Sequence, residues 1–169
     1  MSEDAKPASR GFLTLLITAI LGFVVDLITK SISFEHLVPP EPAYEFIPGF
    51  IHFTAVQNRG AVFGMGQGMR WLFILISLAA IVFVAYLFVR SRRQWWMNLT
   101  LGMLLAGIIG NLYDRVIFGY VRDMIHAFPR WPNLFPWVFN VADSLLCVSI
   151  GILLVTGMFA PDERITDKS

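Results

Sequence analysis

Charged residues are scarce in this sequence. Aspartate, glutamate, lysine and arginine make up 15% of its 169 residues, whereas 56% are hydrophobic. A soluble domain of this length usually carries about 25% charged residues to cover its surface. The formal net charge is only +1, and no basic stripe points to a nucleic acid partner. The shortage of charge therefore predicts a protein whose main solvent is lipid rather than water.

Cysteine is also nearly absent, because Cys147 is the only one. One thiol cannot form an intramolecular disulfide or a cysteine-based zinc site. The three histidines, His36, His52 and His126, do not have the spacing of a zinc-binding motif. The sequence thus disfavours a metalloprotease and gives no reason to expect a metal or another cofactor.

The sequence has long uncharged apolar runs instead. Trp71 to Val89 and Trp95 to Tyr113 are runs of 19 residues without a charge, and Ser144 to Ala160 adds 17 more. A helix needs about 20 such residues to cross the hydrocarbon core, and every backbone polar group must be satisfied within it. We therefore predict helical spans at roughly 11–32, 70–90, 95–113 and 138–160.

The first of these spans is the least regular. Gly11 to Val25 gives only 15 uncharged residues, so the span is long enough only if Asp26 and Lys30 belong to its far end. A cleaved signal peptide is the alternative, because Lys6 and Arg10 precede the apolar run. We disfavour it, since no clear small-x-small cleavage site follows and the helical pattern continues through both charges.

The predicted fold is an all-α membrane protein with four transmembrane helices, forming a single domain over residues 1–169. The connection after the first span contains several prolines, which exclude a long helix there. Phe50 to Val56 has a β-rich composition, and it predicts one or two short strands against the membrane surface. We therefore expect a small β-containing segment outside the cytoplasm, together with outer loops.

The arginines and lysines of short loops predict the direction of the spans. The connection between the second and third spans contains three arginines and no acid: Arg90, Arg92 and Arg93. This connection should be cytoplasmic, so four spans would also leave both termini inside and the other two connections outside. Three arginines in the second outer connection oppose this assignment: Arg115, Arg122 and Arg130.

Charged residues at membrane depth are costly, which makes them candidates for function. Asp26 and Lys30 are four residues apart, so they lie on one helical face. The simplest interpretation is an ion pair at the interface, with Lys30 extended toward water. The sequence leaves open whether Asp26 is a structural anchor or supports a site.

Two further places carry polar residues at span ends. Asn111, Asp114 and Arg115 share a face if the third helix continues past them, although a plain interfacial cap would also explain them. Asn140 and Asp143 are three residues apart at the start of the fourth span, where the positive helix end favours a carboxylate. A helix cap accounts for Asn140 but not for an acid that continues into the bilayer.

The polar segments resemble motifs of the lipoprotein signal peptidase family (signal peptidase II), a group of intramembrane aspartic proteases. The resemblance extends from Asp26 to about Gly157, and four segments carry it: Asn58-Arg59-Gly60-Ala61-Val62-Phe63, Gly110-Asn111-Leu112-Tyr113-Asp114-Arg115, Val121-Arg122-Asp123-Met124-Ile125 and Phe139-Asn140-Val141-Ala142-Asp143-Ser144. The first matches the family's Asn-x-Gly-x-x-Phe pattern. Three residues depart from the family: Leu27 where Gln is usual, Ala106 in place of a Gly, and Met124 where Phe is usual. None of them removes an acid, so they concern local packing or substrate fit.

The resemblance implies that Asp123 and Asp143 form a catalytic dyad. Two carboxyl groups in one confined site cannot both ionise easily, so they hold one proton between them. The resemblance further implies that eight residues bind substrate or support the site: Asp26, Lys30, Asn58, Gly60, Asn111, Asp114, Arg115 and Asn140. The implied substrates are diacylglyceryl-modified prolipoproteins, cut immediately before the lipidated cysteine in the bacterial cytoplasmic (inner) membrane.

Two other functions are compatible with a membrane protein that has acids at its span ends. A proton- or ion-coupled transporter could use Asp123, Asp143 and Arg115 as a relay. It would place the acids nearer the bilayer midplane, and it would usually have repeated halves, neither of which is visible in the sequence. A non-catalytic membrane scaffold is the second alternative, and it would tolerate replacement of either acid by asparagine.

Overall fold

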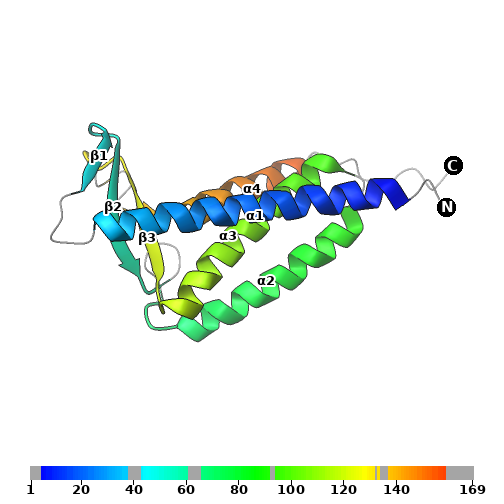
Figure 1. Ribbon diagram of the computed structural model, residues 1–169, viewed down its shortest axis with the longest axis horizontal. Coiled ribbons are helices and arrows are strands. Elements are labelled where there is room, and N and C mark those ends of the chain that lie inside the picture. Colours follow the sequence, from blue (N-terminus) through cyan, green and yellow to red (C-terminus); the bar gives the residue numbers. More distant parts are fainter. Residues whose placement is uncertain are drawn as a thin grey trace.

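The computed structural model describes residues 5–37, 43–60, 66–91, 94–131, 133 and 137–158. It consists of a bundle of helices with a small sheet across one end (Figure 1). The helices are α1 (Ala5–His36), α2 (Arg70–Ser91), α3 (Trp95–Ile117) and α4 (Val141–Met158). All four predicted helical segments are therefore confirmed as helices, although their bounds differ.

Two of these bounds matter for function. Helix α3 continues to Ile117, beyond the predicted end at residue 113, and therefore carries Asp114 and Arg115 on regular helix. Helix α4 begins at Val141 and not at residue 138, because Val138 and Phe139 pair with a neighbouring strand. Asp143 thus lies in the first turn of α4.

Helix α3 is central in the bundle. It contacts each of the other three helices, and Leu101, Leu104 and Ile108 on it belong to the buried core. Glycines allow the close approach, because a Cβ built on Gly102 would lie 2.7 Å from the carbonyl oxygen of Leu15 in α1. A Cβ on Gly107 would likewise lie 2.6 Å from the carbonyl oxygen of Ala142 in α4.

The outer faces of α1 and α2 are apolar and exposed, as expected for surfaces that contact lipid. Ile17 and Leu21 on α1 and Leu75 and Val82 on α2 are exposed by 47% or more. Three of the described helices are long and apolar enough to cross a membrane: Arg10–His36, Arg70–Arg90 and Trp95–Ile117. Helix α4 is a shorter apolar helix. The protein is thus a mostly helical membrane protein with three candidate spans and a small antiparallel sheet.

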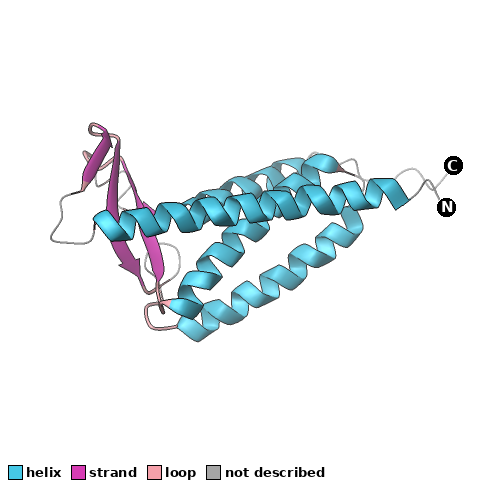
Figure 2. Cartoon of the chain, viewed as in Figure 1, coloured by secondary structure: helices cyan, strands magenta, loops and turns pink. Residues whose placement is uncertain are grey.

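The sheet contains four antiparallel strands in chain order: β1 (Tyr44–Ile47), β2 (Ile51–Asn58), β3 (Val121–Ala127) and β4 (Val138–Phe139). Strand β2 confirms the strand predicted at 50–56. The sheet is larger than predicted because β2 pairs with β3, which comes from the other connection at this end of the bundle. Figure 2 shows the strands crossing the ends of the helices. In this register Val56 lies opposite Asp123, and Asn58 lies opposite Val121.

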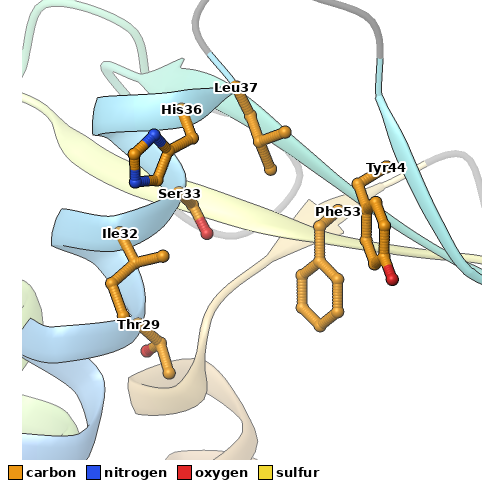
Figure 3. A pocket seen from close by; sticks show the side chains of 7 residues that line it. All are labelled: Thr29, Ile32, Ser33, His36, Leu37, Tyr44 and Phe53. Atoms are coloured by element: carbon orange, nitrogen blue, oxygen red, sulfur yellow. The ribbon is translucent and has the colours of Figure 1, made fainter.

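An apolar pocket of about 370 Å³ lies between the sheet end of α1 and the β1–β2 hairpin. Figure 3 shows the side chains that line it: Thr29, Ile32, Ser33, His36, Leu37, Tyr44 and Phe53. None of these residues is an acid or an asparagine, so the pocket is distinct from the polar cluster described next.

Candidate active site

Asp143 lies at the N-terminus of α4, in a reciprocal cap with Asn140. The backbone N–H of Asp143 donates to Asn140 Oδ1 (2.9 Å), and the backbone N–H of Asn140 donates to Asp143 Oδ2 (3.3 Å). This is the arrangement of a capping box, in which each residue satisfies a free donor of the other. The positive end of the helix also favours a carboxylate here. Local helix chemistry therefore fixes the position of Asp143.

Asp123 lies on β3 and is almost completely buried. Asn58 on β2 donates through Nδ2 to Asp123 Oδ2 (3.0 Å), and Asn140 donates through Nδ2 to Asp123 Oδ1 (2.6 Å). Asn140 thus contacts both acids, one through its side chain and the other through its backbone. The strand pairing of β2 with β3 brings Asn58 to Asp123 although 65 residues separate them in the chain.

Asn111 on α3 completes the set of amide contacts. Its Nδ2 donates to Asp143 Oδ1 at 2.7 Å, and its Oδ1 accepts from Asn140 Nδ2 at 3.2 Å. Each carboxylate oxygen of Asp123 and Asp143 therefore accepts a hydrogen bond from an amide. The two acids belong to one hydrogen-bond network, built from β2, α3, β3 and the start of α4.

A buried ion cluster adjoins this network. Lys30 Nζ lies 2.7 Å from Asp26 Oδ2 and 3.3 Å from Asp114 Oδ2, and it donates to Asn111 Oδ1 at 3.1 Å. The predicted pair of Asp26 with Lys30 is confirmed. The expected extension of Lys30 toward water is wrong, because its side chain is 0% exposed. Buried charges require partners, and Lys30 finds two acids and an amide oxygen inside the bundle.

Asp26 also holds α4. Its Oδ1 accepts from the backbone N–H of Ala142 at 2.8 Å, which satisfies another free donor in the first turn of that helix. Asp26 therefore joins α1 to the start of the helix that carries Asp143. Among the two interpretations left open by the sequence, the observed contact is that of an anchor beside the site.

Arg115 and Gly60 lie on another side of the network. Arg115 donates through Nη2 to the carbonyl oxygen of Gly60 (3.1 Å) and through Nη1 to that of Asn111 (3.4 Å). The backbone N–H of Gly60 donates to Asn58 Oδ1 at 2.9 Å. Gly60 thus holds the asparagine that binds Asp123. Residues 61–63 of the Asn-x-Gly-x-x-Phe segment lie outside the described residues.

Sequence reasoning missed Arg122. Its backbone N–H donates to Asp114 Oδ2 (2.8 Å), and its Nε and Nη2 donate to Asp114 Oδ1 (3.1 and 2.9 Å). The residue directly precedes Asp123, and an arginine among apolar residues next to a candidate acid was the available signal. Asp114 therefore belongs to the ion cluster rather than to the amide network.

Burial and the neighbouring Asp143 raise the pKa of Asp123 to about 7, against the lowering effects of Asn58, Asn140 and Lys30. Burial and the charge of Asp143 both disfavour the ionised form of Asp123, so a second negative charge in the site is unfavourable. Near neutral pH the two acids can therefore retain one proton between them, which provides one general acid and one general base. This arrangement is suited to proton transfer during hydrolysis.

The three residues that depart from the family pattern fill space in the protein and take no part in the hydrogen bonds of the two acids. Ala106 is fully buried, and its Cβ would lie 2.8 Å from a Cβ built on Gly22 of α1, so the methyl group fills space that Gly22 leaves free. Met124 is fully buried on β3, and Leu27 is half-buried on α1. None of the three contributes a hydrogen bond to Asp123 or Asp143.

Comparison with known proteins gives consistent matches. A family model described as signal peptidase (SPase) II matches residues 18–159. The chain is 42% identical to the lipoprotein signal peptidase of Caldanaerobacter subterraneus subsp. tengcongensis, covering 79% of this chain and 90% of the relative. It is 36% identical to the lipoprotein signal peptidase of Ectopseudomonas mendocina, covering 90% and 92%.

Solved structures agree with the fold. The chain resembles a bacterial membrane enzyme solved by the in meso method at 2.3 Å, with a TM-score of 0.79 and 27% identity over 92% of this chain and 93% of that one. A second bacterial membrane enzyme, solved by the same method at 1.9 Å, gives a TM-score of 0.76 and 28% identity over 88% and 94%. The helices and the sheet together therefore reproduce a fold known among membrane enzymes.

Proposed function

The chain belongs to the signal peptidase II family, and from this premise we propose that Asp123 and Asp143 are its catalytic dyad. The protein is an aspartic endopeptidase that removes signal peptides in lipoprotein maturation. One observation carries the assignment of the dyad: Asn140 donates to Asp123 through its side chain and to Asp143 through its backbone. The alternative of a transporter has no support in these matches.

The proposed reaction uses the proton that the two acids share. The ionised acid takes a proton from a water molecule, whose oxygen attacks the scissile carbonyl carbon, while the protonated acid donates to the carbonyl oxygen. The resulting tetrahedral diol then collapses: the C–N bond breaks as the leaving nitrogen takes a proton from the acid that received it from water. One diol hydroxyl returns its proton to the other acid, which leaves a carboxylic acid, an amine and a dyad that again holds one proton. The amides of Asn58, Asn111 and Asn140 hold the carboxyl groups in place throughout.

We propose that the substrates are diacylglyceryl-modified prolipoproteins, cut immediately before the lipidated cysteine. The site supports this choice because it lies at the sheet end of a bundle whose outer faces are apolar. A lipid-anchored peptide can reach such a site from the bilayer while its polar backbone enters the amide-rich cluster. The helices and the sheet both contribute to that cluster, so residues 1–169 act as one peptidase domain in this proposal.

We further propose that α4 is the fourth span, in a bacterial cytoplasmic (inner) membrane. Its 18 residues correspond to about 27 Å of helix, close to the roughly 30 Å of the hydrocarbon core. The arginines around the α2–α3 connection support an orientation with that end of the bundle, together with both termini, in the cytoplasm. Of the three arginines that opposed this orientation in the sequence, Arg115 and Arg122 are engaged inside the protein by Gly60 and Asp114, and Arg130 is exposed.

Cleavage of a purified diacylglyceryl-modified prolipoprotein in detergent, followed by gel shift, tests the dyad. Wild-type protein should cleave it with or without EDTA. Asp123→Asn and Asp143→Asn should each lower the rate by about a thousandfold or more, because each removes a group that acts only together with the other. Glu45→Gln is the matched control, since Glu45 is an exposed acid on β1 and should leave the rate unchanged.

Each variant should first show a cooperative thermal transition in the same detergent. Normal cleavage by a folded Asp123→Asn or Asp143→Asn variant would show that the dyad is misassigned. A wild-type protein that is inert on several lipidated precursors would contradict the proposed substrate class.

A further inference from the structure

Arg122 is an arginine buried directly beside a proposed catalytic acid. It precedes Asp123 on β3, and successive side chains of a strand point to opposite faces. Only 6% of Arg122 is exposed. Its guanidinium group donates to Asp114 through Nε and Nη2 and to Ser31 Oγ through Nη1 (3.4 Å), and it lies 4.4 Å from the centre of the Phe118 ring. Arg122 is therefore fixed in position from α1 and α3.

The charges of the ion cluster balance only when Arg122 is counted. Asp26 and Asp114 contribute two negative charges, and Lys30 and Arg122 contribute two positive charges, in contacts of 2.7–3.3 Å. Arg115 then remains to oppose the single negative charge of a dyad that keeps one proton. Without Arg122, the two acids of the cluster would share Lys30 alone and the buried region would carry an uncompensated negative charge.

We propose that Arg122 is a positioning residue of the dyad: by neutralising Asp114, it keeps the Lys30 charge available to Asp123 and Asp143. The role rests on the proposed function, because it matters only if these two acids work as a pair. Geometry supports it twice. Asp114 lies three residues after Asn111, whose amide binds Asp143, and Arg122 also ties the start of β3, and so Asp123, to the end of α3.

Charged and polar groups face Asp123 from four elements. These are Asn58 on β2, Lys30 on α1, Arg115 on α3, and Asn140 with Asp143 at the start of α4. Replacing Arg122 with a neutral side chain leaves one more negative charge near them. An added negative charge favours the protonated form of an acid, so each proton of the dyad should leave at a higher pH.

The pH dependence of kcat for cleavage of the lipidated precursor tests the charge role. Singly ionised dyads give bell-shaped profiles. Arg122→Met should move both midpoints upward by about half a pH unit or more, as expected for an uncompensated charge in a buried region that adjoins the dyad. Asp114→Asn should move them downward. Asp114→Asn combined with Arg122→Met should return them to the wild-type values, because the cluster is again neutral. Arg122→Lys should keep the wild-type midpoints with a lower rate.

Arg70→Met is the matched control for a purely structural effect. Arg70 also fastens the end of α3, through Nη2 to the carbonyl oxygen of Val116 at 2.8 Å, but it bonds to no acid there. It should leave both midpoints unchanged even if the rate falls.

Unchanged midpoints in both single variants, or a double variant that keeps the shift of Arg122→Met, would overturn the proposal. If Arg122→Met is not produced in folded form, the midpoints of Asp114→Asn and of the double variant test the proposal. They should move downward in Asp114→Asn and equal the wild-type values in the double variant. Wild-type cleavage and its loss in Asp123→Asn are measured in the same assay, so a failure of the proposed function is seen separately.

Discussion

Amide side chains rather than charged ones contact the two acids of the site. Asn58, Asn111 and Asn140 are uncharged donors, so they can hold a carboxyl group without contributing a full positive charge. A lysine or arginine in direct contact would strongly favour the ionised form. The nearby positive charges are instead held by other partners, since Lys30 pairs with Asp26 and Asp114. This separation lets a dyad exchange one proton while its geometry stays fixed.

The raised pKa of Asp123 makes the stability of the protein depend on pH. An acid with a pKa of about 7 in the folded state and 3.8 in the unfolded state contributes stability below pH 3.8 and loses it as the pH rises toward 7. Asp123→Asn removes this loss but also puts an amide donor where two donors already point, which costs about 1 kcal/mol. That cost does not depend on pH, so between pH 5 and 8 the stability of the variant relative to wild type should improve by about 3 kcal/mol.

Thermal unfolding of both proteins in one detergent, at pH 5 and pH 8, measures this difference. Glu35→Gln serves as the control, because Glu35 is an exposed acid on α1 and an exposed acid should give a pH-independent difference. Glu45 is unsuitable here, since it pairs with His52, and histidine changes its charge in this pH range. A constant gap between Asp123→Asn and wild type would mean that Asp123 has an ordinary pKa in the folded protein.

At the scale of elements, the start of α4 combines helix capping with the site. Asn140 caps the helix through Oδ1 and binds Asp123 through Nδ2. Serine is also a good N-cap but has no amide. Asn140→Ser should therefore keep the unfolding temperature near that of wild type while kcat falls at least tenfold, whereas Asn140→Ala should lose about 1 kcal/mol as well. Thermal unfolding together with the cleavage rate separates the two roles. Equal activity of wild type and Asn140→Ser would contradict the role of the Asn140 amide in holding Asp123.

The close contact of α3 with α1 gives another prediction. A Cβ built on Gly110 would lie 2.5 Å from Asp26 Oδ2 and 3.2 Å from the Cβ of Ala142. Gly110→Ala should therefore displace Asp26 from Lys30 and from the start of α4, with a large loss of both activity and stability. Gly151→Ala is the matched control, because a Cβ built on Gly151 meets nothing within 4 Å. Gly151→Ala should retain full cleavage activity. If Gly110→Ala were equally active, α1 would be able to move away from α3 without loss of activity, and the prediction would be wrong.

The sequence predicted the helices well and the sheet poorly, for a physical reason. A helix satisfies its backbone within one segment, so apolar runs in the sequence were enough to find α2 and α3. Strand β3 depends on β2, more than sixty residues away, and no local pattern marks that pairing. The same distance hid the contact of Asn58 with Asp123. The bonds of Arg122 to Asp114 span only eight residues, but they depend on the turn between α3 and β3, which the sequence pattern did not define. The motif residues were identified by resemblance, but their partners required the fold.

At the scale of the whole molecule, the two ends of the bundle differ in kind. The sheet and the polar cluster lie at one end, and the connection between α2 and α3 lies at the other (Figure 1). The arginines around that connection favour the cytoplasm. At the sheet end, Arg115 and Arg122 are bound to internal acceptors, whereas Arg59 and Arg130 are exposed. Two of the three arginines that opposed the orientation in the sequence, Arg115 and Arg122, therefore no longer count against it.

Cysteine labelling tests this orientation in a background in which the native thiol is replaced, Cys147→Ser. Cys147 is exposed on α4, so it would otherwise contribute to the signal. Glu45→Cys on β1 should react with a membrane-impermeant maleimide in intact spheroplasts, because the sheet faces outward in this orientation. Gln94→Cys, which is exposed just before α3 and leaves every arginine in place, should react only after the membrane is permeabilised. The reverse pattern would put the sheet and the acids on the cytoplasmic side, and such a protein could not meet lipidated precursors on the outer face.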